Sequence, residues 1–146
     1  MWKSNYTLCL TSLFFIIPLA YILYRLQQNK HMSTINSILS YMMISVLCLN
    51  VILSILFWYN PVKNSYVHIL DRTLVRISLV LFIIYFCLQR PTLKEIATFV
   101  FILCAIRLFA YYSNYFSSID WCNSKHIQYH SFFHLFCGLG CMYVLI

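Results

Sequence analysis

The sequence predicts an all-α fold, a polytopic bundle of five transmembrane helices that forms a single domain over residues 1–146. The first observation is composition: 62% of the residues are hydrophobic and only 9% are charged. Soluble domains have about 25% charged residues, so a soluble fold would have too little polar surface to cover it. The second is the apolar runs, each close to the ~20 residues that a helix needs to cross a bilayer. Because these runs are continuous rather than alternating, a transmembrane β-barrel is not expected.

The five predicted spans follow one another with short connections. They cover residues 6–26, 38–59, 69–88, 96–112 and 127–146. Pro61 and Pro91 come just after the second and third spans, where a helix commonly stops. The first span could be taken for a signal peptide with Lys3 as its basic region. It ends in Tyr24-Arg25 without a small-residue cleavage site, so we expect it to be retained.

The net charge of +7 comes from ten Lys or Arg and three Asp or Glu residues. Most basic residues lie between the spans, where they set topology and meet anionic lipid headgroups. No basic run is longer than two residues, so nucleic-acid binding is not expected. The two membrane faces carry four basic residues each, and the positive-inside rule therefore does not choose an orientation. We expect an integral membrane location.

Polar and ionisable residues of the spans gather toward one leaflet, on the face that holds the N-terminus and the second and fourth loops. They are, in chain order, Ser54, Trp58, His68, Asp71, Arg72, Arg76, Arg107, His126, His130 and His134. Ionisable side chains inside a membrane are costly, which makes them candidates for function. Four different spans contribute to the group, and this convergence predicts one polar site.

The histidines of the last span are spaced to bind a metal ion. His130 and His134 are one helical turn apart, about 6 Å in rise, which suits two imidazoles on one ion. On the third span, His68 and Asp71 share a helix face. A zinc site would use His130, His134 and His68, with Asp71 as a ligand or holding the bound water. Zinc would lower the pKa of that water and make hydroxide available for hydrolysis.

The same residues also have structural interpretations. Histidines at a helix start near the interface can meet headgroups and water. Asp71 can neutralise Arg76 or Arg107 inside the bilayer. Gly138 and Gly140 are typical of helix-packing contacts rather than of a binding loop.

The segment HSFFHLFCGLG, residues 130–140, is similar to the last-helix motif of the alkaline ceramidases. In that motif a His-x3-His pair precedes a small, glycine-containing stretch, and the enzymes belong to the CREST superfamily of seven-helix membrane proteins with a zinc site. By this resemblance His130 and His134 would bind zinc and Asp71 would assist the catalytic water. Ser54 would stabilise the site or the oxyanion. Trp58 stands where the family pattern has its first zinc-binding histidine, and five spans stand in place of seven.

Three functional hypotheses follow from these observations. The first is a zinc-dependent hydrolase of a lipid amide or ester, such as a ceramide-like substrate. The second is a non-catalytic multi-pass membrane protein that uses the polar group for structure, for a lipid headgroup, or for a membrane protein partner or second copy. The third is a bis-histidine haem b, for example between His68 and His130.

Overall fold

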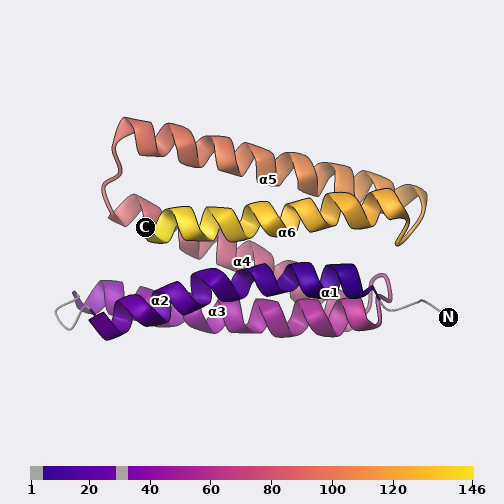
Figure 1. Ribbon diagram of the computed structural model, residues 1–146, viewed down its shortest axis with the longest axis horizontal. Helices are drawn as coiled ribbons and strands as arrows, with labels where there is room; N and C mark the ends of the chain where they lie inside the picture. The colour runs from indigo at the N-terminus through magenta and orange to yellow at the C-terminus, as the bar shows by residue number, and fades with distance from the viewer. Residues whose placement is uncertain (1–4, 29–32) are drawn as a thin grey trace.

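The computed structural model describes residues 5–28 and 33–146. Its elements are α1 (Tyr6–Ser12), η1 (Leu13–Phe15), α2 (Ile16–Gln28), α3 (Thr34–Tyr59), α4 (Tyr66–Leu88), α5 (Leu93–Ile119) and α6 (Ser124–Leu145). Successive long helices run antiparallel (Figure 1). The start of α1, the α3–α4 loop and the α5–α6 loop therefore lie at one end of the bundle, which we name the site end. The predicted all-α fold is confirmed.

Each of the five predicted spans corresponds to helix. The first is the continuous segment α1–η1–α2, and the other four are α3 to α6. Three segments are long and apolar enough to cross a membrane, namely Tyr6–Gln28, Thr34–Tyr59 and Leu93–Ile119. This finding supports the predicted membrane location. The helices α4 and α6 differ from those three because they carry most of the ionisable residues of the polar group near their starts.

Polar N-cap residues at the starts of α4 and α6 position two of the histidines. The Ser65 hydroxyl accepts a hydrogen bond from the backbone N–H of His68, and the Asn123 side chain accepts one from the backbone N–H of His126. Such caps satisfy amide groups that have no partner within the helix. Both histidines are thereby held in the first turn of their helices, at the site end.

The helices pack as two pairs joined by the N-terminal segment. α3 packs against α4, α5 packs against α6, and α1, η1 and α2 contact both α3 and α6. Among the described residues the backbones of α4 and α5 do not approach each other closely, and α4 also packs against α6. The two helices meet through their side chains near the end opposite the site end, where Phe86 of α4 and Phe99 of α5 have ring centroids 4.3 Å apart. A Cβ atom added to Gly138 would lie 3.5 Å from Phe14 Cβ, and one added to Gly140 would lie 3.3 Å from Ile102 Cγ2. The two glycines thus lie at helix contacts.

Hydrogen bonds between side chains join the helices inside the bundle. The Asn50 amide donates to Ser78 Oγ over 2.6 Å, which links α3 to α4. Ser12 and Ser54 are 2.9 Å apart and link α1 to α3. In a membrane, helix association depends on close packing and on such polar contacts, because lipid tails are as apolar as the helix surfaces. These bonds fix the walls of the site described next.

Candidate functional site

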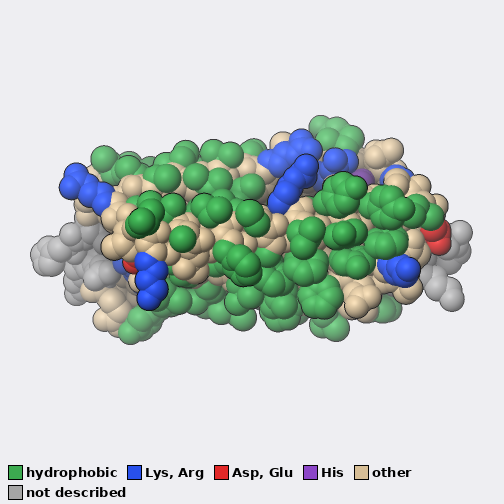
Figure 2. All heavy atoms as spheres, turned by 90° about the horizontal axis from the view of Figure 1, so that it is seen from above, with side chains coloured by type: hydrophobic (Ala, Val, Ile, Leu, Met, Phe, Trp, Pro, Cys, Tyr) green, Lys and Arg blue, Asp and Glu red, His purple; other side chains and the backbone are tan. Residues whose placement is uncertain are grey.

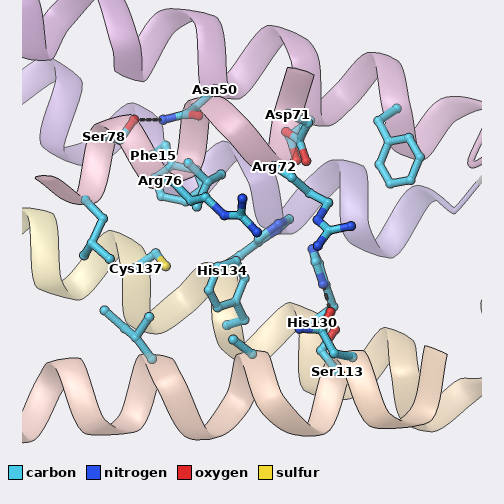
Figure 3. A pocket seen from close by; sticks show the side chains of 18 of the residues that line it. Phe15, Asn50, Asp71, Arg72, Arg76, Ser78, Ser113, His130, His134 and Cys137 are labelled. Carbon is cyan, nitrogen blue, oxygen red and sulfur yellow. Dashed lines mark hydrogen bonds between the residues drawn. The ribbon is translucent and has the colours of Figure 1, made fainter. Parts of the chain in front are cut away.

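A cavity of about 510 Å³ lies between α4 and α5, and residues of α3 and α6 complete its lining (Figure 3). All five site residues predicted from the sequence line it: Ser54, His68, Asp71, His130 and His134. They come from three helices and from segments up to 80 residues apart, since residue 54 and residue 134 face the same space. The predicted convergence of polar residues toward one leaflet is therefore reproduced by the packing.

The histidine pair on α6 is held by hydroxyl groups of two other helices. The ring centroids of His130 and His134 are 4.7 Å apart, nearly perpendicular. His130 Nδ1 lies 2.9 Å from Ser113 Oγ on α5, and His134 Nδ1 lies 3.0 Å from Thr11 Oγ1 on α1. The Thr11 hydroxyl also lies 3.2 Å from the carbonyl of Leu8. With its proton on that carbonyl, His134 Nδ1 donates to Thr11 and Nε2 keeps a free lone pair; with its proton on His134 Nδ1, Nε2 carries the ring proton.

The other two histidines repeat one local arrangement. His68 Nδ1 accepts from the backbone N–H of Asn64 at 3.0 Å, and His126 Nδ1 accepts from the backbone N–H of Cys122 at 3.2 Å. Asn64 and Cys122 both have positive φ, 61° and 62°, which turns their N–H groups back toward the helix. The proton of each ring is thereby fixed on Nε2. His68 is also stacked on Phe57, with centroids 4.5 Å apart.

Trp58 fills the space beside these rings. Its side chain is 1% exposed, and its ring centroid lies 4.8 Å from that of His130 and 4.6 Å from that of Phe57. It therefore contacts both His130, one member of the histidine pair, and the ring on which His68 stacks. The indole Nε1 is buried without a hydrogen-bond partner among the described residues. At this position the ceramidase-like pattern would have a histidine.

Cationic side chains outnumber acidic ones in the lining. Lys63, Arg72, Arg76 and Arg107 face the cavity, and Asp71 is the one carboxyl group there. Figure 3 shows Arg72 and Arg76 extending from α4 toward His130 and His134. Figure 2 shows a group of Lys and Arg side chains within an otherwise hydrophobic face, with a histidine beside it.

Asp71 does not neutralise these cations. Its side chain is 7% exposed, and its Oδ1 atom is buried with no hydrogen-bond partner in the part of the chain that the structure describes. Neither Arg76 nor Arg107 donates a hydrogen bond to this oxygen. The alternative in which Asp71 pairs with one of these arginines is therefore not supported. The cavity keeps an excess of positive charge and one unpartnered carboxyl oxygen.

The fit of this lining to zinc is limited. Within residues 5–28 and 33–146, no three His, Cys, Asp or Glu side chains are grouped so that they could hold a metal ion. The described arrangement supplies the adjacent pair His130 and His134, while His68 is engaged with Phe57 and the Asn64 backbone. In the α5–α6 loop, burial and the charge of Asp120 raise the pKa of the Cys122 thiol to about 11, so this thiol is neutral at physiological pH. A third ligand would have to move in for zinc to bind.

Sequence reasoning missed the groups that orient the histidines. Thr11 and Ser113 were not singled out, although hydroxyl groups inside apolar spans at the depth of the histidines were a usable signal. Lys63, which lies between the second and third predicted spans, and Asn50 also line the cavity, and neither is among the predicted polar residues. Comparison of this chain with protein families, with curated proteins and with solved structures gives no match.

Proposed function

We propose that this chain is an integral membrane protein that binds a membrane lipid with a phosphate-bearing headgroup in the cavity between α4 and α5. The observation that carries the proposal is the excess of cationic side chains in the cavity, which is lined otherwise by histidine, neutral polar and apolar groups and one carboxyl group. Arg72, Arg76 and Arg107 are exposed on helices that we place in a membrane, and a cation there is costly unless an anion is near it. A phosphate group would supply that anion.

Arginine is well suited to this role. Its guanidinium is planar, stays charged and donates paired hydrogen bonds to phosphate oxygens. Arg72 and Arg76 reach into the cavity from α4, and Arg107 lines it from α5. Arginines of α4 and of α5, on opposite sides of the cavity, would therefore both contact one headgroup.

The rest of the cavity suits acyl chains. Beyond the cationic part, its lining is apolar on both walls, with Leu79, Phe82 and Ile83 from α4 and Phe99 and Leu103 from α5. The backbones of α4 and α5 stay apart along the cavity and the helices meet at Phe86 and Phe99, so a lipid would enter sideways from the bilayer on the site-end side of this contact. This combination of cationic and apolar halves favours an amphipathic lipid over a free phosphate ion.

A zinc-dependent hydrolase of a ceramide-like amide or a lipid ester is the second candidate. The contact of His134 Nδ1 with Thr11 Oγ1, beside the ring of His130, favours it, because metal-binding histidines typically have their second ring nitrogen hydrogen-bonded to an oxygen. Two features favour binding without catalysis. The third ligand is not in place, and Ser54 is already hydrogen-bonded to Ser12 at 2.9 Å. With the Ser12 proton on the Leu8 carbonyl at 2.8 Å, Ser54 donates to Ser12 rather than to an oxyanion.

The proposal is tested by lipid titration of the purified protein. Phosphatidylglycerol, added to the chain in phosphatidylcholine nanodiscs, should bind the wild type and should bind Arg72→Gln/Arg76→Gln at least about tenfold more weakly, since hydrogen bonds to charged groups contribute about 1.5–3 kcal/mol each. The matched control Arg90→Gln/Lys94→Gln removes two cations at the other end of the bundle and should bind like the wild type. Equal affinities for all three proteins would refute the proposal.

A further inference from the structure

We infer that the lipid headgroup carries a primary ammonium group beside its phosphate, as in phosphatidylethanolamine, and that Asp71 receives this ammonium. The inference rests on the proposed lipid-binding function and adds the chemical class of the ligand. It is drawn from a feature of the cavity that a phosphate leaves unexplained.

That feature is the carboxyl group of Asp71. Its side chain is 93% buried, being 7% exposed, it lines the cavity, and its Oδ1 atom has no partner among the described residues. An ionised Asp71 is not satisfied by an anionic phosphate, because both groups are then acceptors and both carry negative charge. The ligand must therefore bring a hydrogen-bond donor to this oxygen, and a positive one by preference.

The arginines do not serve as that donor. Neighbouring residues on a helix do not face each other, so Arg72 points elsewhere than Asp71, and Arg76 is five positions further along α4. In Figure 3 the guanidinium groups of Arg72 and Arg76 extend toward α6, and the Asp71 carboxyl lies apart from them. A headgroup with separated negative and positive ends would contact both places.

The donor count of the ligand selects a primary ammonium. Such a group has three N–H donors and suits a site with several acceptors. Asp71 Oδ1 is one acceptor, and Asn50 Oδ1, which is also buried without a partner among the described residues, is another in the same cavity. The quaternary ammonium of choline has no N–H and would leave both unpaired.

The two tryptophan rings of the cavity, the aromatic groups best suited to hold choline, are also occupied. Quaternary ammonium groups are usually held over aromatic faces. The Trp121 ring is already covered by the Lys63 ammonium at 5.5 Å, and Trp58 is packed against His130. The cavity should therefore discriminate between ethanolamine and choline headgroups.

The test uses the full chain in nanodiscs and three probe lipids that share their acyl chains. Phosphatidylethanolamine should bind the wild type at least about tenfold more tightly than phosphatidylcholine. Asp71→Asn should bring phosphatidylethanolamine down to the level of phosphatidylcholine while leaving phosphatidylglycerol binding unchanged or stronger, because a negative charge has been removed. Asp120→Asn changes a carboxyl outside the cavity and should behave like the wild type.

The outcomes separate the two proposals. Retained phosphatidylethanolamine preference in Asp71→Asn would overturn the role of Asp71 and leave lipid binding standing. If the wild type bound neither phosphatidylglycerol nor phosphatidylethanolamine, the proposed function itself would fail. Should Asp71→Asn not fold, the wild type alone decides with mono- and dimethylated phosphatidylethanolamine. Affinity should fall with each added methyl group, and equal affinity along the series would overturn the inference.

Discussion

Replacing Trp58 by histidine should create a zinc site. The Trp58 ring lies 4.8 Å from the ring of His130, which in turn lies 4.7 Å from the ring of His134. An imidazole at position 58 would occupy part of the space that the indole now fills, next to the existing pair. Three imidazoles and a water are a normal zinc coordination. The variant should therefore bind one zinc per chain, tighter than the wild type does by at least about tenfold.

The same change should lower stability in the absence of metal. Trp58 is 1% exposed, and shortening a buried side chain of this size costs up to about 3–5 kcal/mol. For a chain of this length each kcal/mol lowers Tm by roughly 2–4 °C. Zinc at about 100 times its Kd would raise the free energy of unfolding of the variant again by roughly 2.7 kcal/mol. Zinc content by mass spectrometry and Tm with and without zinc are the measurements.

The control for this experiment is a Trp58→Phe variant, which shortens the side chain without adding a ligand. It should lose stability and gain no zinc. If Trp58→His bound no more zinc than Trp58→Phe, the placement of position 58 beside the histidine pair would be wrong.

Three further predictions concern the frame of the site. Ser113→Ala should lower the free energy of unfolding by about 0.6 kcal/mol, and by at most about 1.7 kcal/mol, because it removes an interhelical hydrogen-bond partner of His130. Thermal unfolding in detergent measures this loss, and an unchanged Tm would contradict the predicted hydrogen bond. Gly140→Leu should separate α5 from α6, since a Cβ alone would lie 3.3 Å from Ile102 Cγ2. The Tm of Gly140→Leu should fall well below that of Gly140→Ala, and equal Tm values for the two variants would argue against the helix contact. Asn123→Ala should destabilise the start of α6 by about 1 kcal/mol, seen as faster amide exchange there, whereas unchanged exchange would refute the cap.

The number and order of the helices could be predicted from apolar runs, but their ends could not. The third helix begins at Thr34 after the Ser33 cap, four residues before the predicted start. The predicted end of the fourth span was residue 112, whereas α5 continues to Ile119. Past residue 112 the sequence is too polar for a hydropathy window. Stacking of Phe116 on Tyr129 of α6, with centroids 5.3 Å apart, holds this last part of the helix against its neighbour.

The site could be predicted as a group of residues but not as an arrangement. Spacing placed His130 and His134 on one face, and helix direction placed Ser54 and Asp71 at the same depth. No local pattern indicates that Ser113 and Thr11 orient the two rings, because this depends on how α5 and α1 rotate against α6. The excess of cations also emerges only when α4 and α5 are seen to face the same cavity.

Native mass spectrometry of the chain released from nanodiscs tests the central claim most directly, because one spectrum reports both bound lipid and bound metal. We predict that the wild type retains a phosphate-bearing lipid and that Arg72→Gln/Arg76→Gln loses it, while Arg90→Gln/Lys94→Gln keeps it. A wild type without lipid that carries one zinc, lost in His130→Ala/His134→Ala, would contradict the account and favour the hydrolase.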